Sequence, residues 1–365
     1  MILSKSKNNL DVLRLFASLT VLFGHSYSLL NRDAPVFLGM LIHSVAVRVF
    51  FVMSGLLVFN SFRRDPCVGS FFVKRILRLL PGLIVLLLIT VFAIGPFLTA
   101  LTWYQYFSHP GTWRYLANVT LKIVQHLPGV FNSNPSSSVN ISLWTLPIEM
   151  LMYACVPLLY HATNRVKHKK IFLFSLVAAL WSLNFYFVPS RPCFTISVAN
   201  IYLRDLVALS AYFLVGVFFE VNSDFIKLDR RLGLLLLLFL FWGVSLPLGY
   251  RDIVLCIIVS YLVFIFAFCC PLLFSSLVKK GDFSYGVYLY GYPVQQIIIH
   301  FIPDILPYQL FWLSLPVTFL FAVFSWFLVE KKTLYWSHYF KNKKSLNSTI
   351  HFLNQHKNHK KQVLR

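Results

Sequence analysis

The sequence predicts an all-α polytopic membrane protein with about ten transmembrane helices. Hydrophobic residues make up 58% of its 365 residues and charged residues only 12%, about half the charged fraction of a typical soluble domain. Many apolar runs approach the ~20 residues that an α-helix needs to cross a bilayer. These runs are continuous rather than alternating, which excludes an outer-membrane β-barrel.

Polar stretches and stretches that contain Pro or Gly separate the apolar runs and define the candidate helices. We expect the loop 101–141 to lie outside the membrane or to contain a re-entrant segment. The first run is long, lacks a small-residue cleavage site and contains Arg14, so a retained helix is predicted rather than a cleaved signal peptide. The predicted helices span residues 12–30, 36–60, 76–100, 142–160, 171–188, 205–221, 233–248, 252–272, 284–302 and 308–329.

The basic residues predict the orientation. If the N-terminus is cytoplasmic, 26 of the 33 Lys and Arg lie in inner segments, six lie in outer segments, and Arg48 lies within a helix. This asymmetry follows the positive-inside rule and predicts that both termini are cytoplasmic. It also explains the net charge of +21 without a nucleic-acid partner. We therefore expect a membrane domain over 1–332 and a basic cytoplasmic tail over 333–365 that is attracted to anionic headgroups.

Arg14 and His25 interrupt the first apolar run. Eleven helical residues turn through about 1,100°, which leaves the two side chains within roughly 20° of one face. Ionisable groups inside a membrane are candidates for a functional site. A neutral imidazole can accept a proton, as a general base must. The alternatives are a snorkelling arginine and a histidine with a packing role.

Arg75 and Arg78 lie three residues apart at the predicted inner start of the third helix, so they share a helical face. Two such guanidiniums can bind phosphate groups bidentately. The alternative is an ordinary positive-inside cluster. Arg14 is expected at the same membrane level, and the three arginines could therefore converge on one anionic ligand.

Three further residues of the predicted helices are candidates. Glu149 is the one acidic residue of the run 142–160, and a glutamate opposite His25 would orient the imidazole. It could instead bond the 101–141 loop. Arg48 has no obvious partner in the sequence and belongs either to a binding site or to a buried structural pair. Gly55 is predicted to permit close helix packing. The six cysteines contain no CxxC pair, and we predict no metal site.

At these residues the chain resembles the acyltransferase-3 family of membrane-bound O-acyltransferases. Six blocks in the family's order extend from about residue 9 to residue 332. Lys74, Gly291 and Lys332 depart from the family pattern, which has Arg, His and Pro at these places. The blocks are LDVLRLFASLTVLFGHS with its Arg-x10-His spacing, FFVMSGLLVFNSF, FFVKRILRLLPGL, SLWTLPIEMLMY, GDFSYGVYLYGYPV and SWFLVEKK.

The resemblance implies an enzyme of a bacterial-type inner (cytoplasmic) membrane. Such an enzyme would move an acetyl group from cytoplasmic acetyl-CoA to a hydroxyl of an extracytoplasmic or lipid-linked glycan, such as O-antigen or exopolysaccharide. Acetyl-CoA is a co-substrate here, and no permanently bound cofactor is expected. The partners would be the acyl-CoA, a glycan or glycolipid acceptor and the lipid bilayer.

The same resemblance suggests roles for individual residues. His25 would be the general base and Glu149 its stabilising carboxylate, while Arg14, Arg75 and Arg78 would bind the phosphates of coenzyme A. Arg48, Trp144 and Trp113 are weaker candidates for substrate contacts.

Two questions stay open. Transfer could be direct or could pass through a covalent acyl-enzyme, for which Ser26 and Ser28 are near His25. The alternative function is a transporter or flippase for a glycolipid or a small anion, because intramembrane Arg and His also suit a permeation path.

Overall fold

Helices make up nearly all of the regular structure, as the apolar runs predict. The computed structural model describes residues 8–336, apart from 38, 188–194, 197–200, 244–245, 247 and 274–279. In this part of the chain, ten helices of at least 14 residues coincide with the ten predicted runs. They are α1 (Leu10–Ser28), α2 (Ile42–Arg64), α3 (Val68–Ile89), α7 (Thr145–Arg165), α8 (Lys169–Phe187), α9 (Leu203–Val221), α10 (Arg230–Gly243), α11 (Leu248–Cys269), α13 (Ser284–Phe301) and α14 (Pro307–Ser325).

Length and composition support the membrane class. Five helical stretches of the described residues are long and apolar enough to cross a bilayer. The prediction of an all-α, multi-pass membrane protein is thereby confirmed, whereas ten crossings and cytoplasmic termini stay predictions. The tail beyond residue 336 lies outside the described residues. The five stretches are Ile42–Arg64, Val68–Leu98, Ile141–Arg165, Tyr250–Cys269 and Pro307–Trp336.

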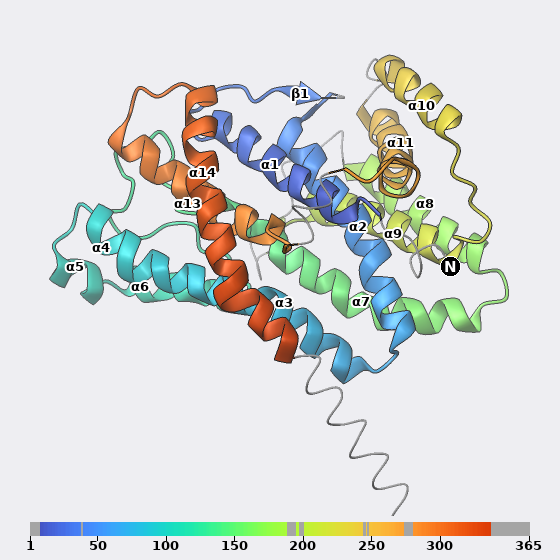
Figure 1. Cartoon of the computed structure of the whole chain (residues 1–365), viewed down its shortest axis with the longest axis horizontal. Coiled ribbons are helices and arrows are strands. Elements are labelled where there is room, and N and C mark those ends of the chain that lie inside the picture. Colours follow the sequence, from blue (N-terminus) through green and yellow to red (C-terminus); the bar gives the residue numbers. More distant parts are fainter. Residues whose placement is uncertain are drawn as a thin grey trace, which may run out of the picture.

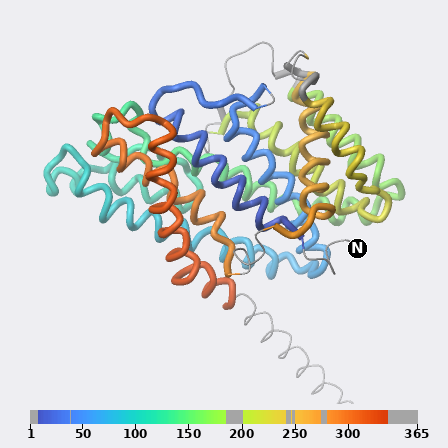
Figure 2. The backbone as a smooth tube through the Cα atoms, turned by 45° about the horizontal axis from the view of Figure 1, so that its top comes forward, coloured from blue at the N-terminus to red at the C-terminus, as the bar shows by residue number. Residues whose placement is uncertain are grey.

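The bundle is organised around α1 and α2, which pack against each other in its middle (Figure 1). Helices α13 and α14 form a pair on the α1 side, and α9 and α8 form a pair on the α2 side. Helices α10 and α11 pack together beyond α9, as Figure 2 also shows. Asn8 and Leu334 line the same cavity, so both ends of the described chain lie on one side of the bundle.

The second helix begins later than predicted. We expected it over 36–60, but α2 starts at Ile42, and a short antiparallel hairpin of β1 (Val36–Phe37) and β2 (Met40–Leu41) precedes it. Gly39 takes the turn with a φ of 72°, a conformation that favours glycine. Apolar residues alone do not distinguish a strand from a helix over so short a run. A second pair, β3 (Thr195–Ile196) with β4 (Ile201–Tyr202), precedes α9.

The 101–141 segment carries more structure than the predicted loop. It contains the short helices α5 (Trp103–Ser108) and α6 (Pro110–Arg114) and a 3₁₀ turn over Tyr115–Thr120. It follows a π-helical turn (Thr90–Ile94) and α4 (Gly95–Leu98) that extend α3, and it leads into a 3₁₀ turn, η4 (Ile141–Trp144), before α7.

Hydrogen bonds attach this segment to α13. Gln296 donates to the carbonyl of Ser136 at 2.8 Å, and Asn134 donates to the carbonyl of Gln296 at 2.9 Å. Tyr106 and Tyr115 are fully buried. The segment is therefore packed onto the bundle rather than being a free loop.

Glycines set the distance between α2 and α9, as predicted for Gly55. A Cβ atom added at Gly55 would lie 1.9 Å from the carbonyl oxygen of Phe213, and one at Gly216 would lie 2.2 Å from that of Val52. Both obstacles are backbone atoms, which cannot rotate away. Small residues at such crossings let helix backbones approach closely in a membrane.

Replacing Gly55 by Ala should therefore push α2 and α9 apart. We expect a loss of about 1–3 kcal/mol, typical of overpacking, seen as a lower thermal midpoint of the detergent-solubilised protein. Gly69→Ala is the matched control, because a Cβ atom at Gly69 meets nothing within 4 Å. Equal midpoints for the two variants would contradict the close-packing interpretation.

Candidate active site

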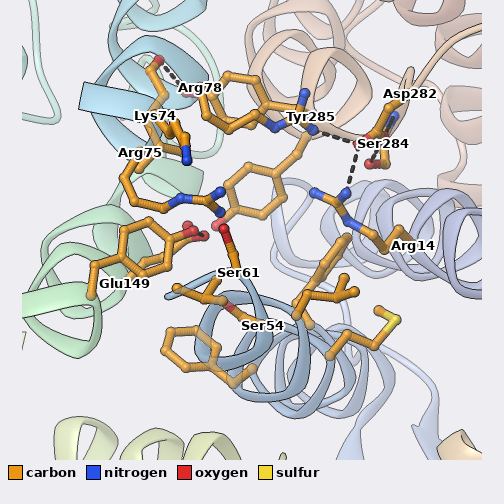
Figure 3. A pocket seen from close by; sticks show the side chains of 18 of the residues that line it. Arg14, Ser54, Ser61, Lys74, Arg75, Arg78, Glu149, Asp282, Ser284 and Tyr285 are labelled. Atoms are coloured by element: carbon orange, nitrogen blue, oxygen red, sulfur yellow. Dashed lines mark hydrogen bonds and ion pairs between the residues drawn. The ribbon is translucent and has the colours of Figure 1, made fainter. Parts of the chain in front are cut away.

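The described residues enclose a cavity of about 820 Å³ that brings the three predicted arginines together (Figure 3). Arg14 comes from α1, and Arg75 and Arg78 come from α3. The walls are otherwise mixed: α2 contributes mainly apolar side chains, and α7 and α13 contribute polar ones. These include Val47, Phe50, Phe51, Ser54 and Leu57 from α2, Thr145, Glu149 and Tyr153 from α7, and Ser284, Tyr285 and Tyr288 from α13.

Asp282 compensates two of the three guanidiniums. Its Oδ2 lies 2.6 Å from Nη1 of Arg14 and 2.5 Å from Nη2 of Arg78. The Ser284 hydroxyl and backbone N–H donate to the other carboxylate oxygen. Burial alone would raise the pKa of Asp282, but Arg14, Arg78 and the Ser284 hydrogen bonds hold it well below its usual range. The carboxylate is therefore charged and links α1, α3 and the start of α13.

Arg78 has a second carboxylate partner at the end of α14. A π-helical turn, η5 (Trp326–Glu330), follows α14 and places Glu330 Oε2 3.5 Å from Nη1 of Arg78. The Ser325 hydroxyl donates to Oε1 of Glu330 at 2.9 Å. Single π turns are frequent at functional sites, and this one brings a carboxylate to Arg78, which itself lines the cavity.

Arg75 differs from the other two arginines because no ion pair or hydrogen bond holds its guanidinium among the described residues. The guanidinium carbon lies 5.8 Å from the ring centroids of Phe71 and Tyr153. Its Nε is buried without a hydrogen-bond partner. Figure 3 shows the side chain pointing toward the middle of the cavity. The Arg75 guanidinium is thus a positive charge in the cavity that is available to an anionic ligand.

Glu149 also lines the cavity, but it does not orient His25 as we predicted. The Tyr153 hydroxyl donates to Glu149 Oε1 from one helical turn away, and no contact between Glu149 and His25 occurs in the described part of the chain. The sequence identifies a carboxylate on α7, but it does not reveal which face of α7 points toward α1.

His25 lies beyond the end of the cavity rather than in its wall. Its Nδ1 is 3.4 Å from the Ser142 hydroxyl, which belongs to η4. The Tyr292 ring is edge-on at 5.3 Å between centroids, and the His43 ring is tilted at 5.5 Å. Three elements other than α1 therefore surround the imidazole.

Hydrogen bonds connect the cavity wall to His25. The hydroxyls of Thr145 and Tyr288, both lining residues, are 2.6 Å apart. The Tyr288 hydroxyl donates to the Ser142 carbonyl at 2.5 Å. The Ser142 hydroxyl then contacts His25. Ser142 thus lies between the cavity and the imidazole.

A proline in α13 helps to fix this connection. Pro293 lacks an N–H, so the carbonyl of Leu289, four residues earlier, loses its helical partner. The Asn140 side chain donates to that carbonyl at 2.9 Å and accepts from the Ser142 N–H at 3.0 Å. The missing helical hydrogen bond is therefore replaced by one that fastens η4 to α13.

The remaining candidates lie outside the cavity wall. Arg48 donates to the Ser44 carbonyl at 3.0 Å, and its guanidinium is 5.7 Å from the Tyr212 ring centroid. This placement favours the structural alternative for Arg48. Trp144 is partly buried and packs against the main core. Trp113 is 47% exposed on the 101–141 segment, where its indole N–H donates to the Phe107 carbonyl.

Comparison with known proteins identifies the family. The family model described as an acyltransferase domain (acyltransferase-3) matches residues 7–331, nearly the whole chain. The chain belongs to the acyltransferase-3 family. Membership makes it an O-acyltransferase and supports the enzyme over the transporter alternative.

Two curated relatives agree with this assignment. An O-acetyl transferase of Shigella phage Sf6 is 28% identical over 341 residues, covering 90% of this chain and 96% of the relative. Nodulation protein 10 of Rhizobium leguminosarum bv. viciae is 31% identical over 204 residues, covering 49% of this chain and 51% of the relative. No solved structure matches this acyltransferase.

Several residues of the site were not singled out from the sequence. Asp282, Tyr288 and Ser142 lie within two of the blocks that resemble the family, and this was the signal available. Nothing in a single sequence shows that Asp282 meets Arg14 across 268 residues. No group of three or more His, Cys, Asp or Glu side chains in the described ranges is arranged to hold a metal ion.

Replacing Asp282 by Asn should leave two half-buried guanidiniums short of a counter-charge. We expect the acyltransferase to lose about 3–5 kcal/mol of stability at neutral pH. Because the folded pKa of Asp282 is depressed, the wild type keeps this contribution above its unfolded value of about 3.9 and loses it as pH falls through the folded pKa. Thermal midpoints measured at neutral and acidic pH report both effects.

The control for this variant is Asp304→Asn, which removes an exposed carboxylate between α13 and α14. Added phosphate should partly restore the midpoint of the Asp282 variant, because an anion can replace the lost charge. A midpoint unchanged at neutral pH would show that the shared carboxylate is dispensable.

Proposed function

We propose that this acyltransferase moves an acetyl group from acetyl-CoA to a hydroxyl of an extracytoplasmic or lipid-linked glycan, from the inner membrane of a bacterium. One observation carries the proposal: a cavity lined by four guanidiniums, those of Arg14, Arg64, Arg75 and Arg78, also contains side chains that are hydrogen-bonded to the residue in contact with His25. The relative named O-acetyl transferase supports acetyl as the transferred group.

The electrostatics of the cavity suit a donor that is charged at one end. Coenzyme A carries its phosphates at one end and an uncharged pantetheine arm at the other. Arg75 lines the cavity without a carboxylate partner in the described structure, so it is a cation that the phosphates can bind. Arg14 and Arg78 are largely compensated by Asp282, so an uncharged arm can pass them without displacing strong ion pairs.

The deeper wall suits the arm and its thioester. Phe50 and Leu57 of α2 supply apolar surface, and Glu149 supplies a carboxylate that can accept from an amide N–H of the arm. In this proposal Glu149 acts on the donor rather than on His25. The thioester would then approach Tyr288 and Ser142, behind which His25 lies.

His25 would act as the general base. Its free ring nitrogen takes the proton from the acceptor hydroxyl as the oxygen attacks the thioester carbonyl. When the C–S bond breaks, the thiolate leaves and takes this proton from the imidazolium. The proton balance closes with the two substrates alone, and the products are an O-acetyl ester and coenzyme A.

The acceptor would approach from the opposite side, along the 101–141 segment. Trp103, Tyr104 and Trp113 are 61%, 83% and 47% exposed there. Exposed aromatic faces offer apolar surface against which sugar rings can stack. An interfacial belt at the membrane surface would expose the same residues, so a glycan-binding assay with these aromatics changed to Ala separates the two roles.

Replacing His25 by Ala should abolish acetylation without preventing folding. General-base catalysis supplies about 10²–10⁴-fold, so kcat should fall by about that factor. The measurement is mass spectrometry of surface glycans from cells that carry either form, in which each acetyl group replaces a hydrogen. Wild-type glycan acetylation by the variant, at equal protein level in the membrane, would reject His25 as the base.

Replacing Arg75 by Gln should raise KM for acetyl-CoA by about 10–100-fold, the value of one charge-assisted hydrogen bond of about 1.5–3 kcal/mol. The uncharged donor S-acetylpantetheine should be used equally well by both forms, because it lacks the phosphates. Arg165→Gln, an exposed charge at the end of α7, serves as the control. An equal rise in KM for both donors would show that Arg75 does not bind the phosphates.

A further inference from the structure

Ser142 is the one residue whose hydroxyl is within hydrogen-bond reach of the His25 ring in the part of the chain that the structure describes. The distance from Ser142 Oγ to His25 Nδ1 is 3.4 Å. His43 and Tyr292 meet the same ring only through their faces or edges. The hydroxyls of Ser26 and Ser28, which the sequence suggested near His25, donate to carbonyls of their own helix instead.

The peptide of Ser142 is held at both of its polar groups. Its N–H donates to Asn140 Oδ1 at 3.0 Å, and its carbonyl accepts from the Tyr288 hydroxyl at 2.5 Å. A phenol has a single proton, which Tyr288 gives to that carbonyl, so Thr145 must donate to Tyr288. Ser142 is also only 1% exposed. The backbone position from which the Ser142 side chain extends is therefore fixed.

We propose that Ser142 is a positioning residue for His25, and that Tyr288 acts through it; this rests on His25 as the general base. A neutral imidazole has one N–H and one lone pair. With Nδ1–H donating to the Ser142 hydroxyl, the lone pair is on Nε2 and is available for the acceptor's proton. The opposite tautomer, with Ser142 donating to Nδ1, would occupy the lone pair and leave Nε2 without basicity.

The arrangement suits both protonation states of the ring. When Nε2 gains the proton, Nδ1–H continues to donate to Ser142, so the contact needs no rearrangement during transfer. The distance of 3.4 Å is long, but catalytic hydrogen bonds are often long before substrate binds. Tyr288 and Thr145 line the cavity, so a donor bound there can touch the same residues that hold Ser142.

Substitutions at both positions test the proposal in purified full-length protein. The assay uses radiolabelled acetyl-CoA and surface polysaccharide extracted from a strain whose own gene is deleted. Ser142→Ala should lower kcat about 10–100-fold and change KM for acetyl-CoA less than about twofold, because it removes a hydrogen bond to a ring that becomes charged. Ser142→Thr keeps the hydroxyl and should restore most of the activity.

A double-mutant cycle tests whether Tyr288 acts through Ser142. Tyr288→Phe should lower kcat less than Ser142→Ala does, and the double variant should lose no more than Ser142→Ala alone. Losses that multiply would mean that Tyr288 acts independently and would overturn this part of the proposal. Ser18→Ala is the matched control, because Ser18 is equally buried in α1 and its hydroxyl donates within its own helix.

Two further outcomes separate the possible failures. An active His25→Ala variant would overturn the proposed function itself. An inactive His25→Ala beside a fully active Ser142→Ala would overturn only the role of Ser142. With labelled acetyl-CoA and no acceptor, the peptide that contains Ser142 should stay unlabelled. Acetyl found on Ser142 would make this residue a nucleophile instead of a positioning residue.

Discussion

The packing of α1, α3 and α13 around the cavity depends on one carboxylate. Asp282 Oδ2 is within 2.6 Å of Arg14 and 2.5 Å of Arg78, so a residue just before α13 holds α1 and α3 in place. Inside a bilayer a charge is costly, and pairing with an opposite charge lowers this cost. Asp282 and Glu330 pair with Arg14 and Arg78, so Arg75 is the one of these three arginines without an ion pair in the described structure. In the proposed function, this pairing leaves Arg75 available to an anionic donor.

The same requirement for internal partners explains how irregular helices hold the site. Pro81 frees the Leu77 carbonyl in α3, and the Thr333 hydroxyl donates to it at 3.3 Å. Pro293 frees the Leu289 carbonyl in α13, and the Asn140 side chain donates a hydrogen bond to this carbonyl. Each proline thus exchanges a bond within one helix for a bond between elements. The second exchange fixes the turn that carries Ser142.

The sequence was informative where a property belongs to one helix. Apolar run length located the ten long helices, and the three-residue spacing of Arg75 and Arg78 predicted that the two share a helical face, from which both line the cavity. It was less informative where the answer depends on contacts between helices. Arg14 meets Asp282 across 268 residues, and the rotation of α7 turns Glu149 toward the cavity instead of toward His25. Local periodicity contains neither fact, and the order of the family-like blocks gives sequence position but not contact.

The separation between the cavity and His25 follows from the chemistry that the two ends require. The phosphates of a donor need uncompensated cations, whereas a general base works best as a neutral imidazole away from guanidiniums, which would oppose its protonation. In the proposed mechanism, Arg75 and His25 meet these two needs separately, because Arg75 lines the cavity beside apolar α2 side chains and Tyr288, whereas His25 is not among the lining residues. The short chain through Tyr288 and Ser142 then joins the two ends by hydrogen bonds. Hydrogen bonds can fix the geometry of the imidazole without the electrostatic repulsion by which nearby guanidiniums would oppose its protonation.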